Sequence, residues 1–196
     1  MSDGTTTELS RAAKNYWSEA GYAPGGIIRE VDYAAAASGL HPLLEGIKIV
    51  DCDTHFTEPP DLFTSRAPAR IRDKVPHQKI VNGITRWFVG DDDYGIVGGN
   101  VIKPDHNKLL GRLSFPTLEE GHPGAYKVKP RLQAMDDMGI YAQICYQNSG
   151  VTQAGSLMHL DDEGGVTVLQ IYNDAAAERQ VESGQRLFTL AHLPLW

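Results

Sequence analysis

The chain has 196 residues, of which 41% are hydrophobic and 22% charged, and a net charge of −7 at pH 7, as expected for a globular protein with its own core. The acidic balance, with no basic stripe to offset it, argues against a nucleic-acid partner. No apolar run approaches the roughly 20 residues that span a bilayer, and the polar segment 1–8 lacks the features of a signal peptide, so we expect no membrane partner and a cytoplasmic location.

Residues 1–46 are interpreted as an N-terminal extension without chemistry of its own. A short helix is expected over 7–17, and a second helical turn over 31–38 with Gly39 as its stop. The expected role of this extension is to pack against the rest of the fold or against a partner.

The apolar run 47–50 predicts a buried strand, and it is followed at every second position by Asp51, Asp53 and His55. Side chains alternate across a strand, so these three should point to the same side. A carboxylate and an imidazole two residues apart can bind one divalent cation. The two prolines at 59–60 cannot continue a paired strand, so the chain should leave the sheet where the ligands are presented.

A long insertion is expected over 61–129. Residues 79–81 and 84–89 flank an Asn-Gly pair, the strongest two-residue turn signal, and predict a β-hairpin. The acidic triplet 91–93 is interpreted as a loop, and a solvated turn is favoured over a calcium site because spaced oxygen ligands are missing.

Helices and strands alternate after the insertion. The expected order is a helix, a strand, a second helix and a third strand, over 130–138, 141–146, 166–183 and 187–193. This alternation is typical of a parallel sheet. Cys52 and Cys145 fall in expected strands and are interpreted as buried thiols rather than a disulfide pair.

The segment 53–59, Asp-Thr-His-Phe-Thr-Glu-Pro after an apolar strand, resembles the first strand of the amidohydrolase superfamily. The branch it resembles is amidohydrolase-related family 2, which includes metal-dependent aromatic-acid decarboxylases and hydrolases. Many members carry His-x-His there; this sequence has Asp53 at the first ligand position, where an acid also occurs in this branch. Segments 131–140, 171–174 and 193–195 are similar to the next family elements, so the resemblance covers 47–196, the front half of the family pattern.

The resemblance implies an α/β fold that contains the first three β/α units of a TIM-like (β/α)8 barrel, with the insertion 61–129 as a lid over the site. Such a barrel takes about 250 residues, and only three core strands are expected here. Because an open sheet edge exposes unpaired backbone groups, we expect a hetero-oligomer in which a second polypeptide carries the remaining barrel strands.

The resemblance also implies that Asp53 and His55 hold one divalent metal ion, with zinc as the first choice and manganese or iron as alternatives. In the family, a histidine after strand five and an aspartate after strand eight complete the site. Asp51 either orients His55 or is a buried acid paired with a backbone donor. Glu58 either reaches the site or braces the turn before Pro59.

Substrate contacts are expected near the ends of the later strands. Gln147 and Asn148 follow the second strand, and a polar substrate contact is one interpretation of both. His192 lies within the expected third strand and either faces the cavity or belongs to the core. Trp87 either forms an aromatic wall for a flat substrate or belongs to the hairpin core.

The function implied by the resemblance is hydrolysis of a small, aromatic amide, ester or activated aryl ether by metal-activated water. Non-oxidative decarboxylation of an aromatic acid is the alternative within the family, and an arginine facing the site would favour it; the candidates are Arg66, Arg70 and Arg112. A non-catalytic half-barrel scaffold is the alternative of another class. The acids of 51–53 also resemble the nucleophile loop of haloacid-dehalogenase phosphatases, but His55 stands where that family normally has Thr or Val.

Overall fold

A computed structural model of the chain describes residues 29–32, 42–97, 100–110, 114–152, 157, 160 and 162–194. The helix expected over 7–17 lies outside these residues. The helical turn expected over 31–38 is wrong at its start, because its first two residues belong to strand β1 (Arg29–Asp32), which pairs antiparallel with β6 (Asn107–Leu110). Short 3-10 helices fill many of the connections: η1 (Pro42–Leu44), η2 (Ala69–Ile71), η3 (Leu118–Glu120), η4 (Pro123–Ala125) and η5 (Gly150–Thr152).

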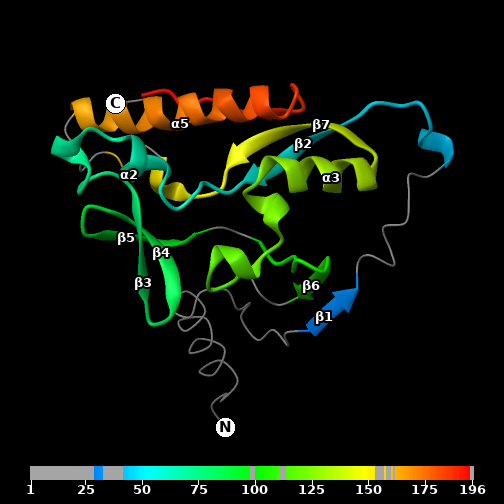
Figure 1. Cartoon of the computed structure of the whole chain (residues 1–196), viewed down its shortest axis with the longest axis horizontal. Helices are drawn as coiled ribbons and strands as arrows, with labels where there is room; N and C mark the ends of the chain where they lie inside the picture. Colours follow the sequence, from blue (N-terminus) through cyan, green and yellow to red (C-terminus); the bar gives the residue numbers. More distant parts are fainter. Residues whose placement is uncertain are drawn as a thin grey trace, which may run out of the picture.

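The centre of the fold is a three-stranded parallel sheet with the order β2-β7-β8. Helix α3 precedes β7 and helix α5 precedes β8, so the predicted alternation of helices and strands is confirmed (Figure 1). The third strand is shorter than expected. The bounds are β2 Ile49–Phe56, α3 Val128–Met138, β7 Ile140–Gln147, α5 Asp162–Glu182 and β8 Leu187–Thr189.

The two faces of this sheet differ in burial. On one face Phe56, Cys145 and Leu187 form a buried cluster with apolar residues of α3. On the opposite face His55 and its register partner Tyr146 are exposed, as are Val50, Phe188 and, just after β8, Leu190. Ala142, the register partner of Val50, is buried, and Ile144, the partner of Phe188, is half-buried. Among the described residues, α3 and α5 cover the side of the parallel sheet that carries Phe56, and no described helix covers the other side.

The prediction that 47–50 is a buried strand is wrong. Ile47 is 56% exposed and Val50 is 48% exposed, because Val50 lies on the uncovered face. The prediction that Cys52 is buried is also wrong, because Cys52 is a free, exposed cysteine. Cys145 is free and buried, as expected.

The insertion contains helix α2 (Leu62–Arg66) and an antiparallel sheet of β3 (His77–Val81), β4 (Ile84–Val89) and β5 (Asp92–Ile96). The predicted hairpin is confirmed: Asn82 and Gly83 form its turn with positive φ angles of 52° and 80°. The prediction of a loop at 91–93 is wrong for Asp92 and Asp93. Both pair with β4, because the chain turns back at Gly90 and continues the sheet.

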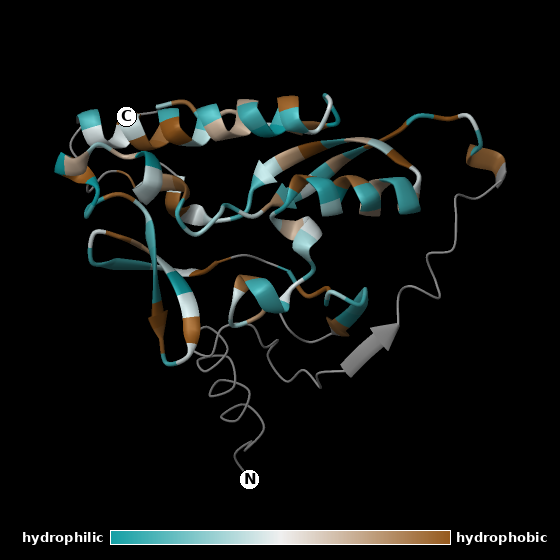
Figure 2. Ribbon diagram, in the orientation of Figure 1, coloured by the Kyte–Doolittle hydropathy of each residue, from teal (hydrophilic) through white to brown (hydrophobic). Residues whose placement is uncertain are grey.

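The insertion shares its core with α5. Phe63 of α2 and Trp87 of β4 are fully buried in one cluster with Leu169 and Tyr172 of α5. The end of the hairpin is apolar and exposed, as the brown tip of β3 in Figure 2 shows, and Ile80 there is 73% exposed. Among the described residues, no helix combines the length and the apolar character that crossing a membrane requires.

The junction between α3 and β7 depends on one left-handed residue. Gly139 has φ 71°, and its N–H bonds to carbonyl groups of the last turn of α3, so the chain can reverse directly into β7. This backbone conformation is strained for most residue types. Glycine adopts it freely, and asparagine tolerates it better than the others.

We expect Gly139→Ala to lower the free energy of unfolding by about 1 kcal/mol, measured by urea denaturation followed by circular dichroism. Gly139→Asn is the matched control at the same position, and it should lose less because asparagine tolerates the left-handed region. An alanine variant as stable as the asparagine variant would contradict the assigned cap.

Candidate functional site

A bulge in β2 changes the geometry that strict alternation predicts. Asp51 pairs with Gln143 and Thr54 pairs with Cys145, so three steps along β2 match two steps along β7. The prediction that all three motif residues share one face is therefore wrong for Asp51. It accepts a hydrogen bond from Gln143 Nε2 (3.0 Å) and another from the backbone N–H of Asp53 (3.1 Å). Of the two interpretations of Asp51, these contacts favour that of an acid paired with a backbone donor.

His55 lies on the exposed face of the sheet, near its C-terminal end. Its Nδ1 is 2.6 Å from the backbone oxygen of Gln147, and because a carbonyl only accepts, Nδ1 carries the proton. The lone pair of Nε2 is therefore left for another partner, which is the arrangement found in metal-binding histidines. The ring also lies 5.8 Å from that of Tyr146. Asp53, two residues earlier, is exposed as well.

Glu58 is fully buried and joins two loops. Its carboxylate accepts hydrogen bonds from the backbone N–H groups of Asn148 (3.1 Å) and Ser149 (3.2 Å), so the chain after β2 is tied to the chain after β7. Burial raises the pKa of Glu58, an effect that these backbone donors and Arg179 partly offset. In this position Glu58 braces the turn, as one of its two sequence interpretations states.

Gln147 and Asn148 lie at the expected edge of the sheet, but their side chains are engaged within the protein. The amide of Asn148 donates to the hydroxyl of Thr57, and the side-chain oxygen of Gln147 accepts from Thr152. Gln147 instead contributes its backbone oxygen, which accepts a hydrogen bond from His55 and orients its ring.

His192 and Trp87 pack against other parts of the fold. The prediction that His192 lies within a strand is wrong, because β8 ends at Thr189. Its backbone exchanges two hydrogen bonds with the side chain of Asn173, and its ring packs edge-on against that of Tyr172 at 4.8 Å. Trp87 is fully buried and meets Phe63 at 6.0 Å, which favours the hairpin-core interpretation.

The arginines named as candidates for the decarboxylation alternative are paired with acids where the structure describes them. Arg66 makes a two-bond ion pair with Glu178, and Arg70 pairs with Glu163. Arg112 lies outside the described residues.

Arg131, to which the sequence analysis assigned no role, contacts the candidate site from the helix side of the sheet. Arg131, in the first half of α3, donates to the backbone oxygen of His55 (2.7 Å) and to the side chains of Thr54 and Gln143. Burial lowers its pKa. The sequence gives no local sign of this role, since an arginine early in a helix is commonly solvent-exposed.

Among the described residues, no group of three or more His, Cys, Asp or Glu side chains is placed to hold a metal ion. Asp53 and His55 are of the residue types that bind zinc and similar divalent ions, but by themselves they do not make up a group of this size.

The fold is similar to part of a known structure. An amidohydrolase from Mycobacterium avium subsp. paratuberculosis K-10, known from its crystal structure, superimposes with a TM-score of 0.53 and 16% sequence identity over 74% of this chain. The chain spans only 42% of the length of that protein. No family model matches the sequence, and no curated protein matches it either. At this identity the likeness concerns the fold: a part of an amidohydrolase-like α/β structure.

We expect Glu58→Gln to lower the free energy of unfolding by about 1–3 kcal/mol at pH 7. The amide must turn its NH2 group toward one of the two backbone N–H donors, so that one buried bond is lost. Urea denaturation measures the change, and Glu119→Gln, at an exposed acid of the insertion, is the control. Equal stability of both variants would contradict the bracing role of Glu58.

We also expect His192 to make stability depend on pH. Burial lowers its pKa below the usual value of 6.5, so the unfolded chain takes up a proton before the folded chain does. Stability should therefore fall as pH falls through 6.5 toward the lower folded pKa, and His192→Gln should reduce this loss. Denaturation midpoints at pH 7.5 and 5.5 test it; an unchanged pH slope in the variant would refute it.

Proposed function

We propose that this chain is one subunit of a metal-dependent, amidohydrolase-like hydrolase whose barrel and site are completed by a second polypeptide. The observation that carries the proposal is the hydrogen bond from His55 Nδ1 to the Gln147 backbone oxygen. It leaves Nε2 as an available ligand atom on the exposed face of the sheet, with Asp53 two residues away. The fold-level likeness to an amidohydrolase supports the same assignment.

The need for a partner is inferred from the uncovered side of the sheet. The apolar side chains of Val50, Tyr146, Phe188 and Leu190 are 39–48% exposed there. Within the described part of the chain, β2 and β8 each pair with β7 alone. In a closed barrel this face would be the packed interior, and both edges would be paired. A second chain that carries the remaining strands would satisfy both requirements.

The proposed chemistry assigns separate tasks to the residues of this chain. Asp53 and His55 would hold one divalent ion, with zinc as the first choice, and such an ion makes bound water nucleophilic at neutral pH. The Gln147 carbonyl fixes the His55 ring, and Glu58 holds the two loops beside it. The general base and the remaining ligands would come from the partner. The proposed substrates are small aromatic amides, esters or activated aryl ethers.

Two alternatives differ from this proposal in a testable way. Decarboxylation would be favoured by an arginine facing the site, and Arg66 and Arg70 are instead held by acids. A non-catalytic half-barrel scaffold would also use the exposed apolar face, but it would not need the free Nε2 of His55.

The test is co-expression of this chain with a polypeptide that carries the remaining strands, including a histidine and a late aspartate, sought first in an adjacent reading frame. We expect the purified complex to contain about one equivalent of divalent metal, measured by plasma mass spectrometry. His55→Ala and Asp53→Ala should each lose most of it, since each removes one ligand.

The matched controls are His77→Ala and Asp91→Ala, which change the same residue types on the insertion and should leave metal content unchanged. A complex that forms but holds equal metal in all four variants would refute the metal assignment. A metal-free complex that is stable would favour the scaffold.

A further inference from the structure

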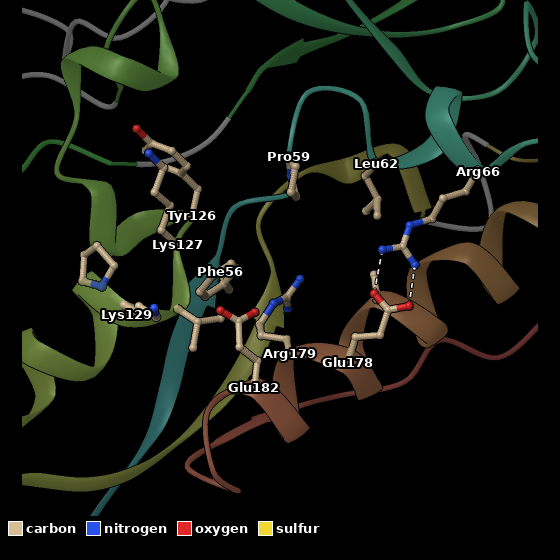
Figure 3. Close-up of a pocket in the computed structure, with 13 residues that line it drawn as sticks. Phe56, Pro59, Leu62, Arg66, Tyr126, Lys127, Lys129, Glu178, Arg179 and Glu182 are labelled. Carbon is tan, nitrogen blue, oxygen red and sulfur yellow. Dashed lines mark hydrogen bonds and ion pairs between the residues drawn. The ribbon is translucent and has the colours of Figure 1, made fainter.

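A pocket of about 440 Å³ lies on the helix-covered side of the sheet, between the start of α3 and the C-terminal half of α5 (Figure 3). Its walls combine apolar and cationic side chains. The lining includes Phe56, Leu62, Val128, Lys127, Lys129 and Arg179. The pocket is separate from the candidate metal site, because Phe56 faces the helices whereas His55 faces the uncovered side of β2.

Arg179 is the buried cation of this pocket. It is only 6% exposed, and its guanidinium stacks over the ring of Phe56 at 4.1 Å from the ring centroid. One of its N–H groups donates to the hydroxyl of Thr189 (3.0 Å). Among the residues that the structure describes, no carboxylate lies within ion-pair distance of this guanidinium.

Two other arginines show what a satisfied guanidinium looks like in this fold. Arg131 donates to four neutral oxygens, and Arg66 makes two bonds to the carboxylate of Glu178. In the part of the chain that the structure describes, the five N–H donors of Arg179 have a single hydrogen-bond acceptor. A buried cation is costly unless its donors and its charge are matched. Arg179 is among the residues that line the pocket, as Figure 3 shows.

The charges around Arg179 favour an anion. Lys127 and Lys129 are exposed at the start of α3, where the first backbone N–H groups of the helix also have no acceptor within it. Of the two acids that line the pocket, Glu178 is neutralised by Arg66, which leaves Glu182. The buried Glu58 acts on Arg179 only through space, since its two oxygens accept backbone N–H groups.

We propose that this pocket binds a small organic acid. The carboxylate would accept hydrogen bonds from Arg179, which presents a planar pair of donors suited to it. The hydrocarbon part would lie on the apolar wall formed by Phe56, Leu62 and Val128. Lys127 and Lys129 would attract the anion at the entrance. The wall distinguishes an organic acid from a bare inorganic anion.

Isothermal titration calorimetry of the chain of residues 1–196 with benzoate, acetate and inorganic phosphate tests the proposal. We expect saturable benzoate binding, weaker acetate binding because the apolar wall is unused, and weak or no phosphate binding. Benzoate affinity should be the same in EDTA and in the His55→Ala variant, which separates this pocket from the metal site. Absence of saturable benzoate binding, or tighter binding of phosphate than of benzoate, would overturn the proposal.

Variants locate the site. Arg179→Gln should weaken benzoate binding at least about tenfold. Since that change could also disturb the fold, two surface variants provide independent evidence. Glu182→Gln should tighten binding about two- to fivefold by removing a repelling charge, a gain that misfolding cannot mimic. Lys127→Ser with Lys129→Ser should weaken it by about two- to tenfold.

The matched control is Lys74→Ser with Lys79→Ser, which removes two exposed lysines outside the pocket and should leave the affinity unchanged. Equal losses in both lysine pairs would show that only net charge matters, and unaltered affinity in the Glu182 variant would show that the ligand does not lie beside Glu182. Either result would overturn the assignment of the pocket.

Discussion

The candidate site depends on the way in which the C-terminal ends of β2 and β7 are held together. Glu58 bonds to the backbone after β7, His55 bonds to the last carbonyl of β7, and Arg131 bonds to both strands from α3. Each contact joins residues far apart in sequence, and Glu58 and Arg131 are largely removed from water. Because buried charged groups are costly when a partner is lost, these contacts fix one register and one orientation of the His55 ring.

The two faces of the sheet explain why the molecule combines a well-packed half with an exposed one. Helix α3 and the end of α5 bury the side chains of one face, whereas the insertion packs mainly against the first half of α5. The insertion therefore shares a hydrophobic core with α5. The face that carries His55 and Asp53 keeps several apolar side chains in water, at a cost that burial against another surface would remove.

Local signals in the sequence predicted most of the elements. The Asn-Gly turn at 82–83 and the glycine at 139 impose specific backbone conformations, and both have the expected effect. The misses concern tertiary context. The bulge that turns Asp51 away is a matter of pairing with β7, and the exposure of Val50 depends on what covers the sheet. Arg131 and Arg179 reach β2 across a long stretch of chain, at His55 and Phe56, and no local pattern encodes these contacts.

The strand end also shows how charge is distributed across the sheet. Asp51 and Glu58 are held within the protein by amide and backbone donors, and the guanidinium groups of Arg131 and Arg179 lie on the helix side of Phe56. Asp53 is exposed, and its backbone N–H donates to Asp51. The guanidinium groups on the helix side are accompanied by the carboxylates of Glu178, paired with Arg66, and Glu182. The proposed cation site beside His55 and the proposed anion pocket beside Arg179 lie on opposite faces of β2, so the same strand separates two sites of opposite preference.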